Sequence, residues 1–275
     1  MNKHYDLVIV GGGAAGLILL ANTFEKATSP LSIAMINTGY PTGKGIAYST
    51  KNSKHLLNVR VSRMSAFTSD ANHFTNWILS KPEYRDYHHE NLGERFVARK
   101  IYGEYLEDLY QSLVKSENKN IQFDLIIDEV IDIKKTDNGF DIKLKNHESI
   151  DGKKVVLCTG NQPPISLPGI SNLKSSNKVF INPWDDRAVE NIDPNQPVFI
   201  VGAGLTMVDT VVSLIDQGFK NKIIVVSKHG AIPMAHPVTR VSVPHPEKAP
   251  ASDIHEIYSE LKSKIRSAID HTEWH

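Results

Sequence analysis

Tyr5–Gly16 reads YDLVIVGGGAAG and decides the fold that we expect for this chain. The apolar run at its start has the composition of a buried parallel strand, and the residues from Ala14 onward have that of a helix. Gly11, Gly13 and Gly16 match the pattern G-x-G-x-x-G. In that pattern the first glycine allows a tight turn, the second lets the backbone approach a pyrophosphate, and the third lets the helix pack closely on the strand. We therefore predict a dinucleotide site at the helix N-terminus; the alternative is a glycine-rich turn in an unrelated α/β protein.

The same arrangement recurs in the second half of the chain. Pro197–Val201 is strand-like and is followed by Gly202 and Gly204. A helix and the strand-like run Ile223–Val226 come next, and Met207 stands where the third glycine would be. This repeat is weaker than the first when taken alone. Together the two repeats predict two nucleotide-binding units in series.

The residue that follows the second strand of each unit bears on the choice of nucleotide. An Asp or Glu at this place hydrogen-bonds a ribose, whereas a basic residue accommodates the 2′-phosphate of NADP. Asn37 follows the strand-like Leu31–Ile36, where it can accept and donate one hydrogen bond in place of the acid. Lys228 follows the corresponding strand of the second unit, with no acid beside it. Lys228 therefore favours NADP over NAD; the alternative is an ordinary solvated lysine.

The region between the two repeats contains a long connection and two helices. Gly43–Phe67 lacks clean periodicity, and long irregular connections tend to carry function. Asn72–Leu79 is expected to be a short helix, and a longer helix is expected to follow Arg95–Gly103. The cluster His88–Glu90 is expected to be solvated, so we predict no metal site.

Strand-like sequence returns before the first unit ends. Leu125–Ile133 is expected to be one strand and Phe140–Leu144 another, joined through the turn residues Asp137–Gly139. Lys154–Leu157 is expected to be a return strand. These strands predict a β-meander inserted in the first unit.

A proline-rich stretch, Asn161–Pro168, reads as a linker and divides the chain into two domains, residues 1–162 and 163–275. An amphipathic helix is expected at Ser252–His271, and the second domain looks incomplete at its C-terminus. The predicted fold class is α/β: two Rossmann-like, three-layer ββα dinucleotide-binding domains, the first with the β-meander insertion.

The composition excludes several classes of partner. The 275 residues include 31 Lys and Arg and 31 Asp and Glu, so the net charge of zero argues against binding to nucleic acid or an anionic membrane surface. Cys158 is the single cysteine, which excludes an internal disulfide and fits a reducing, cytoplasmic setting. The apolar run near the N-terminus is too short for a signal peptide or a membrane span.

With these features the sequence resembles the flavoproteins with two dinucleotide-binding domains, in which FAD sits in the first fold and NAD(P)H in the second. More narrowly, it resembles the bacterial FAD/NAD(P)-binding family, which is distantly similar to N-hydroxylating and Baeyer–Villiger flavin monooxygenases. The resemblance extends over nearly all of the chain. The matching stretches are GGGAAG (Gly11–Gly16), GIAYST (Gly45–Thr50), HLLNVRVSRMSAF (His55–Phe67), ARKIYGEYL (Ala98–Leu106), CTG (Cys158–Gly160), PWD (Pro183–Asp185) and GAGLTMVD (Gly202–Asp209).

The resemblance implies where the cofactors lie. It places the FAD pyrophosphate on Gly11, Gly13, Ala14, Ala15 and Gly16. It brings a second group near the flavin, namely Asn58, Arg63, Met64 and Ser65, with Arg63 either a charge partner or part of an ordinary salt bridge. It lets Val130 contact the adenine through backbone groups and makes Thr159 and Gly160 the link between domains, with Cys158 packing in place of an alanine. It places the second dinucleotide on Gly202, Gly204, Leu205 and Thr206.

The resemblance also implies an activity. It implies an FAD-dependent NAD(P)H oxidoreductase, monooxygenase-like, in which a hydride passes from NADPH to the flavin and electrons then pass to O2 or another acceptor. It names no acid–base side chain, substrate or oligomeric state. The sequence has no Gly-Asp dipeptide, which in such proteins often lies near the flavin on the returning chain. A truncated or short, non-catalytic flavin or nucleotide-binding protein, and an NAD(P)-only dehydrogenase, therefore remain alternatives.

Overall fold

The computed structural model describes residues 3–38, 41–116, 118, 120–162, 164–165, 178–190, 192–234, 259 and 262–263. Contacts between Cα atoms divide the chain into two compact units, Met1–Ala231 and Ile232–His275, and all elements below belong to the first unit. The helix expected at Ser252–His271 lies outside the described residues except at three helical positions, and much of the linker Asn161–Pro168 also lies outside them. That helix and the predicted domain boundary at residue 162 stay predictions.

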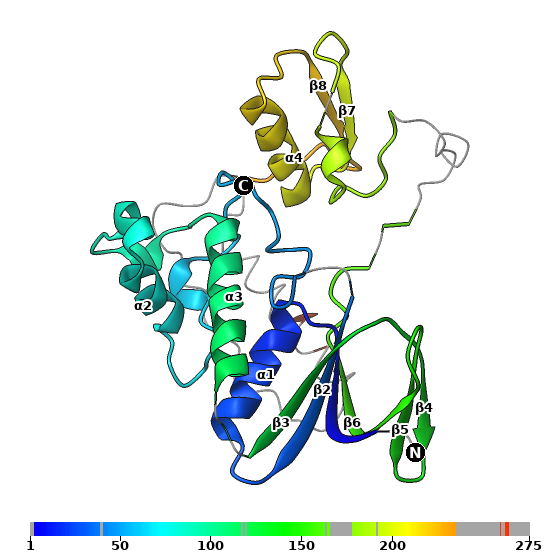
Figure 1. Cartoon of the computed structure of the whole chain (residues 1–275). Helices are drawn as coiled ribbons and strands as arrows, with labels where there is room; N and C mark the ends of the chain where they lie inside the picture. Colours follow the sequence, from blue (N-terminus) through cyan, green and yellow to red (C-terminus); the bar gives the residue numbers. More distant parts are fainter. Residues whose placement is uncertain are drawn as a thin grey trace. The chain divides into compact units, whose positions relative to one another are not determined.

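A six-stranded mixed sheet is the framework of this unit (Figure 1). Four parallel strands stand in the order β3-β2-β1-β6, and the antiparallel strands β5 and β4 continue the sheet beyond β6. The strands are β1 (His4–Val10), β2 (Leu31–Asn37), β3 (Ile121–Ile127), β4 (Val130–Thr136), β5 (Gly139–Leu144) and β6 (Ile150–Leu157). β1 therefore lies inside the sheet, with a hydrogen-bonded strand along each of its two edges.

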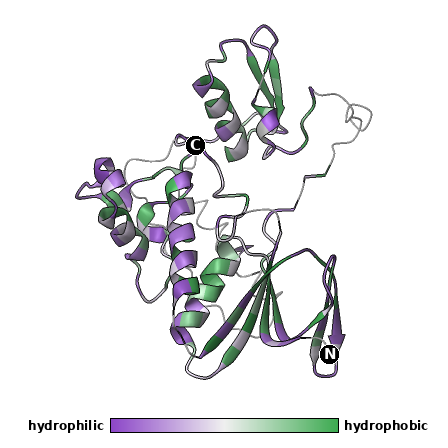
Figure 2. Cartoon of the chain, viewed as in Figure 1, coloured by the Kyte–Doolittle hydropathy of each residue, from purple (hydrophilic) through white to green (hydrophobic). Residues whose placement is uncertain are grey.

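The two faces of the parallel strands are covered by different elements. Helix α1 (Ala14–Lys26) packs on one face, where its Leu20 is fully buried together with Ile9 of β1 and with Ile33 and Met35 of β2. The opposite face packs on β5 and the start of β6 through a cluster that includes Val8, Ala34, Ile36, Ile142 and Leu144. Side chains alternate along a strand, so adjacent residues of β1 enter different cores. The result is three layers, and Figure 2 shows hydrophobic residues along these strands and α1.

The long stretch between β2 and β3 forms a helical insertion. It contains α2 (His73–Ser80), α3 (Arg99–Lys115) and the 3-10 turns η1 (Val61–Arg63), η2 (Pro82–Tyr87) and η3 (Leu92–Glu94). The two helices confirm the sequence prediction. They pack through aromatic rings, with the Phe74 ring centroid 5.0 Å from that of Tyr102 and 4.9 Å from that of Tyr105. Such ring pairs stabilise a core by about 0.5–1.5 kcal/mol each beyond their buried area.

The prediction of one strand over Leu125–Ile133 is wrong, because β3 ends at Ile127 and β4 begins at Val130. Asp128 lies at the break, and its side chain is fully buried. The carboxylate accepts hydrogen bonds from the backbone N–H groups of Glu129, Asn146 and His147 at 2.7–3.0 Å. It also contacts the side chains of Asn146 and His147. A buried carboxylate needs such partners, and they turn the chain out of the β3 line.

The hairpin predicted at Asp137–Gly139 is confirmed. β4 and β5 pair antiparallel, with Thr136 opposite Gly139. Gly139 has a φ of +143°, and a Cβ there would lie 2.4 Å from the carbonyl oxygen of Gly152 on β6. Only β4, β5 and β6 form the meander, since β3 pairs with β2 in parallel.

The second strand–helix–strand repeat forms as predicted. β7 (Val198–Val201) and β8 (Ile223–Val226) pair in parallel, α4 (Leu205–Asp216) connects them, and a short 3-10 turn η5 (Asp186–Ala188) precedes them. Gly218, with a φ of +84°, follows the helix and lets the chain turn back. In the described part of the chain, no helix is long and apolar enough to cross a membrane.

Candidate nucleotide-binding sites

The first glycine-rich turn joins β1 to α1. The Gly11 N–H donates a hydrogen bond to the carbonyl oxygen of Ile36 at 2.8 Å, so the turn lies across the carboxyl ends of β1 and β2. Gly11 has a φ of +109°, and a Cβ there would lie only 2.1 Å from the carbonyl oxygen of Cys158 at the end of β6. Only glycine satisfies both conditions.

The other two glycines of this turn bring the helix close to the strand and leave its first turn open. A Cβ at Gly16 would lie 2.0 Å from the carbonyl oxygen of Gly11, which confirms the predicted close packing. Gly13 precedes α1 with φ −77° and ψ −166°, and no described side chain caps the helix. The first turn of α1 holds no acid. The N–H groups and positive dipole end of α1 therefore suit an anion such as a pyrophosphate.

The second glycine-rich turn has nearly the same backbone dihedral angles as the first. Gly202 has a φ of +103°, and its N–H donates to the carbonyl oxygen of Val226 at the end of β8 at 2.7 Å. Gly204 precedes α4 with φ −81° and ψ −175°, again with no cap from a described side chain and no acid in the first turn. The predicted residues Leu205 and Thr206 form that first turn. A Cβ added at Gly202 would meet no atom of the described residues within 4 Å, whereas one added at Gly11 would clash.

Asn37, predicted at the ribose position, stands at the end of β2 beside the first turn. A Cβ on Gly12 would lie 2.7 Å from Cβ and Cγ of Asn37, so these two residues are in tight contact. The residue Asn37 is only 7% exposed, and its Nδ2 donates to Oγ1 of Thr42 at 3.2 Å. Asn37 thus already interacts inside the protein, and its contact with a ribose stays a prediction.

Gly43 and Gly45 close the first turn from the other side, a role that the sequence did not predict for them. The Gly43 N–H donates to the carbonyl oxygen of Gly12 at 2.7 Å. A Cβ at Gly45 would lie 3.2 Å from Cα of Gly13. Gly43 and Gly45 have φ values of +90° and +54°. The signal was present, since two glycines in GKG inside a long loop indicate a close approach of backbones.

The four residues expected near the flavin lie around the 3-10 turn η1: Asn58 precedes it, Arg63 ends it, and Met64 and Ser65 follow it. Asn58 and Arg63 are exposed, and Met64 packs against the core of the helical insertion. Arg63 makes no ion pair with any acid that the structure describes, so the salt-bridge alternative finds no support there. The Ser65 hydroxyl contacts the carbonyl oxygens of Phe67 and Asp70, which shapes its own turn.

Tyr105 of α3 supports that segment from beneath. The Ala66 N–H donates to the Tyr105 hydroxyl at 3.2 Å, and the hydroxyl lies 2.8 Å from Nδ1 of His73. Burial raises the pKa of Tyr105 to about 12, so the hydroxyl keeps its proton at neutral pH. The stretch Asn58–Ser65, which holds the four residues expected near the flavin and is called the flavin-side segment below, is therefore attached at its end to a buried aromatic core.

Three of the remaining predicted residues follow the carboxyl ends of strands, and Val130 lies at the amino end of β4. Val130 begins β4 opposite Leu144, and Thr159 and Gly160 follow β6 and are exposed. The half-buried Cys158 precedes them, and burial raises the pKa of its thiol, which agrees with a packing role. Lys228 is exposed, two residues beyond β8. A crevice outside the carboxyl ends of parallel strands is where ligands bind in such sheets.

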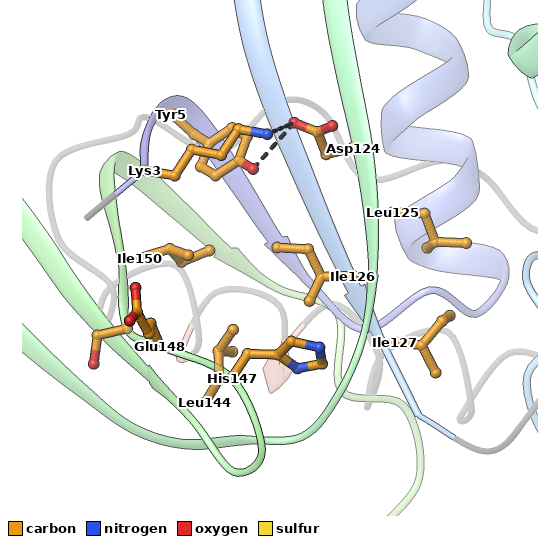
Figure 3. A pocket seen from close by; sticks show the side chains of 11 residues that line it. Lys3, Tyr5, Asp124, Leu125, Ile126, Ile127, Leu144, His147, Glu148 and Ile150 are labelled. Atoms are coloured by element: carbon orange, nitrogen blue, oxygen red, sulfur yellow. Dashed lines mark hydrogen bonds and ion pairs between the residues drawn. The ribbon is translucent and has the colours of Figure 1, made fainter. Parts of the chain in front are cut away.

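A separate hollow of about 530 Å³ lies between β3 and the β5–β6 turn (Figure 3). Its floor includes Ile126 and Leu144, and at its rim Asp124 accepts hydrogen bonds from Nζ of Lys3 at 2.9 Å and from the Tyr5 hydroxyl at 3.0 Å. Lys3 and Tyr5 lie at the start of β1, at the opposite end from Gly11, and Asp124 lies on β3. The hollow is therefore not part of either glycine-rich turn.

A comparison with protein families gives the identity of the fold. A family model described as FAD-NAD(P)-binding matches residues 8–162, more than half of the chain. The chain belongs to this family. FAD and NAD(P) are accordingly its cofactors, as the sequence resemblance implied, and the uncapped helix at Gly13 fits the first of them. A comparison with curated proteins finds no match.

The fold of this chain is similar to those of several solved FAD/NAD(P)-binding oxidoreductases. The ornithine N-hydroxylase of Kutzneria sp. 744 has a TM-score of 0.60 at 17% identity, over 82% of this chain and 53% of that one. The bacillithiol disulfide reductase of Staphylococcus aureus has a TM-score of 0.55 at 14% identity, over 97% and 65%. Cyclohexanone monooxygenase bound to epsilon-caprolactone has 0.54 at 17% identity, over 80% and 38%. This chain thus spans 38% to 65% of the length of these three proteins.

Proposed function

We propose that this chain is an FAD-dependent NAD(P)H oxidoreductase of the monooxygenase-like kind, acting on a small-molecule substrate. The observation that carries the proposal is the duplicated turn. Gly11 and Gly202 share a φ near +105° and the same hydrogen bond to the neighbouring strand, and both turns precede a helix without an acid in its first turn. Two nucleotides in one chain fit a reaction between two nucleotide cofactors.

Each turn has a separate role in this proposal. N–H groups at the start of α1 bind the FAD pyrophosphate, and those at the start of α4 bind NADPH, with Lys228 at its 2′-phosphate. Arg63, exposed and without an ion pair to described acids, faces the flavin as a cationic group. When bound, FAD would supply the redox chemistry, namely hydride transfer from NADPH and electron transfer to O2 or another acceptor. The proposal keeps the predicted domains, residues 1–162 for FAD and 163–275 for NAD(P).

The test is a visible absorption spectrum of purified protein, repeated after adding FAD and then NADPH without oxygen. Flavin bands that bleach with NADPH support the proposal. Bound flavin that NADPH does not reduce indicates the non-catalytic binding protein, and a colourless protein that still turns over NADPH indicates the NAD(P)-only dehydrogenase. A chain that takes up no flavin at all overturns the proposal.

Two matched variants assign the turns. In Gly13→Ala the added Cβ would lie 3.5 Å from Cα of Gly45, an ordinary contact, and in Gly204→Ala it meets open space. Neither position has a positive φ, so both variants should fold. Gly13→Ala should lose FAD, because its methyl group occupies the approach of the pyrophosphate, whereas Gly204→Ala should keep FAD and lose its reduction by NADPH. The reverse pattern would overturn the assignment.

A further inference from the structure

Helix α4 presents a row of polar residues to a segment far away in the sequence. Asp209, Ser213 and Asp216 lie at positions i, i+4 and i+7, on one face of the helix. Each contacts a residue of the range 52–58 or Arg99, which begins α3. The range 52–58 ends at Asn58, the first of the residues expected near the flavin. This polar face therefore connects the second glycine-rich turn to the flavin-side segment.

The ion pair in this row with the least exposed side chains is Arg99–Asp209. Nη1 of Arg99 donates to Oδ2 of Asp209 at 2.7 Å, and the two side chains are only 9% and 16% exposed. Nη2 of Arg99 donates to the carbonyl oxygen of Leu56 at 3.0 Å and to Oδ1 of Asn58 at 3.4 Å. Removing two charges from water is costly unless their geometry is good and their other hydrogen-bonding groups are satisfied. Arg99 meets that condition with these three acceptors.

His55 makes a second connection beside the ion pair. Its Nε2 lies 3.0 Å from the carbonyl oxygen of Asp209 and 2.9 Å from Oγ of Ser213, and its Nδ1 lies 2.8 Å from Oγ1 of Thr50. The backbone N–H of Arg99 also donates to the backbone carbonyl oxygen of His55 at 2.6 Å. The two side chains therefore hold the same point of α4, and a displacement of α4 would leave buried charges unpaired.

We propose that Arg99 and Asp209 are a positioning pair that couples binding of NAD(P) at the second turn to the environment of the flavin. The inference rests on the proposed function. Asp209 lies five residues after Gly204, about 7 Å along the helix from the nucleotide end. Arg99 donates to Asn58, which the family resemblance places near the flavin. A nucleotide that shifts or tightens α4 thus acts on Asn58 through one buried pair, without any direct contact.

The test compares FAD-loaded wild type with Arg99→Gln, Asp209→Asn and the double variant. NADP⁺, which cannot reduce the flavin, is added while the visible spectrum of FAD is recorded, and its binding is measured separately by calorimetry. The single variants should lower the affinity for NADP⁺ by about tenfold and weaken the spectral response of the flavin. The double variant, which leaves no buried charge unpaired, should lose less than the product of the two single effects.

The matched control is the exposed pair Lys54–Asp216, which joins the same helix to the same segment with side chains 61% and 38% exposed. Lys54→Gln and Asp216→Asn should leave the flavin response unchanged, because exposed pairs contribute little. If Asp209→Asn does not fold, Asp209→Glu keeps the charge and should show an intermediate response.

The outcomes separate this inference from the proposed function. Three results would overturn the positioning role alone. The two single-variant losses of NADP⁺ affinity could simply multiply in the double variant, or the variants could keep the wild-type flavin response. The third such result is a Lys54–Asp216 control pair that behaves like the buried pair. A wild type that binds no FAD or no NADP⁺ would overturn the proposed function and this inference with it.

Discussion

Gly11→Ala offers the sharpest test of the geometry of the first turn. Its φ of +109° is unfavourable for alanine, and such backbone strain costs about 1–3 kcal/mol. The new Cβ would also lie 2.1 Å from the carbonyl oxygen of Cys158, and relieving such overpacking costs a further 1–3 kcal/mol or so. The free energy of unfolding should therefore fall by about 2–6 kcal/mol in total. That is a large part of the roughly 5–15 kcal/mol of a typical domain.

Gly13→Ala, two residues away in the same turn, is the control for this prediction. Its φ is −77° and its added Cβ makes only an ordinary contact, so its stability should stay the same or rise by up to about 1 kcal/mol. Gly202→Ala should lie between the two, since it has the strain without the clash. Urea denaturation of the FAD-free proteins, followed by far-ultraviolet circular dichroism, measures all three without a contribution from bound cofactor. Equal stabilities for Gly11→Ala and Gly13→Ala would refute the reasoning.

Three further predictions concern single side chains. Burial acts to raise the pKa of the Asp128 carboxyl, but hydrogen bonds from His147, Asn146 and the Glu129 N–H outweigh it and hold the pKa well below its usual range. The ionised carboxylate therefore stabilises the folded state at any pH above the unfolded pKa of about 3.9. That stabilisation is lost as the pH falls through the folded pKa. Thermal unfolding at a series of pH values should therefore show a steeper acid loss for wild type than for Asp128→Asn, and parallel curves would contradict this. Tyr105→Phe leaves the Ala66 N–H without its partner and should cost about 1–3 kcal/mol in urea denaturation, whereas Tyr110→Phe, whose hydroxyl has no hydrogen bond to a described residue, should be neutral; equal effects would point to packing alone. Lys228→Ala should weaken NADP⁺ binding by about tenfold or more in calorimetry and leave NAD⁺ unchanged, and equal losses for both nucleotides would remove Lys228 from the 2′-phosphate.

Local features of the fold followed from the sequence with good agreement. The helix α1, the hairpin at Asp137–Gly139 and the second turn at Gly202 all formed where their patterns placed them. Each depends on residues that are close along the chain. A glycine at positive φ, an apolar strand and a following helix are constraints that a few neighbouring residues can satisfy by themselves.

The strand Leu125–Ile133 shows where such local reasoning fails. Its composition is strand-like throughout, yet Asp128 is buried and takes backbone hydrogen bonds from a loop some eighteen residues later. Those hydrogen bonds outweigh the β propensity of the flanking residues, because a buried carboxylate without partners is far more costly than a broken strand. Only the packed structure shows that these partners are within reach.

The sequence by itself determined two glycine-rich turns, their order and the nucleotide class that they suit, because each turn is specified within about twelve residues. The tertiary structure decided what surrounds them: the contact of Gly12 with Asn37, the closure of the first turn by Gly43, and the Arg99–Asp209 pair. The two residues of that pair are 110 positions apart. Their attraction depends on burial and on a fixed distance, and neither quantity exists until the chain has folded.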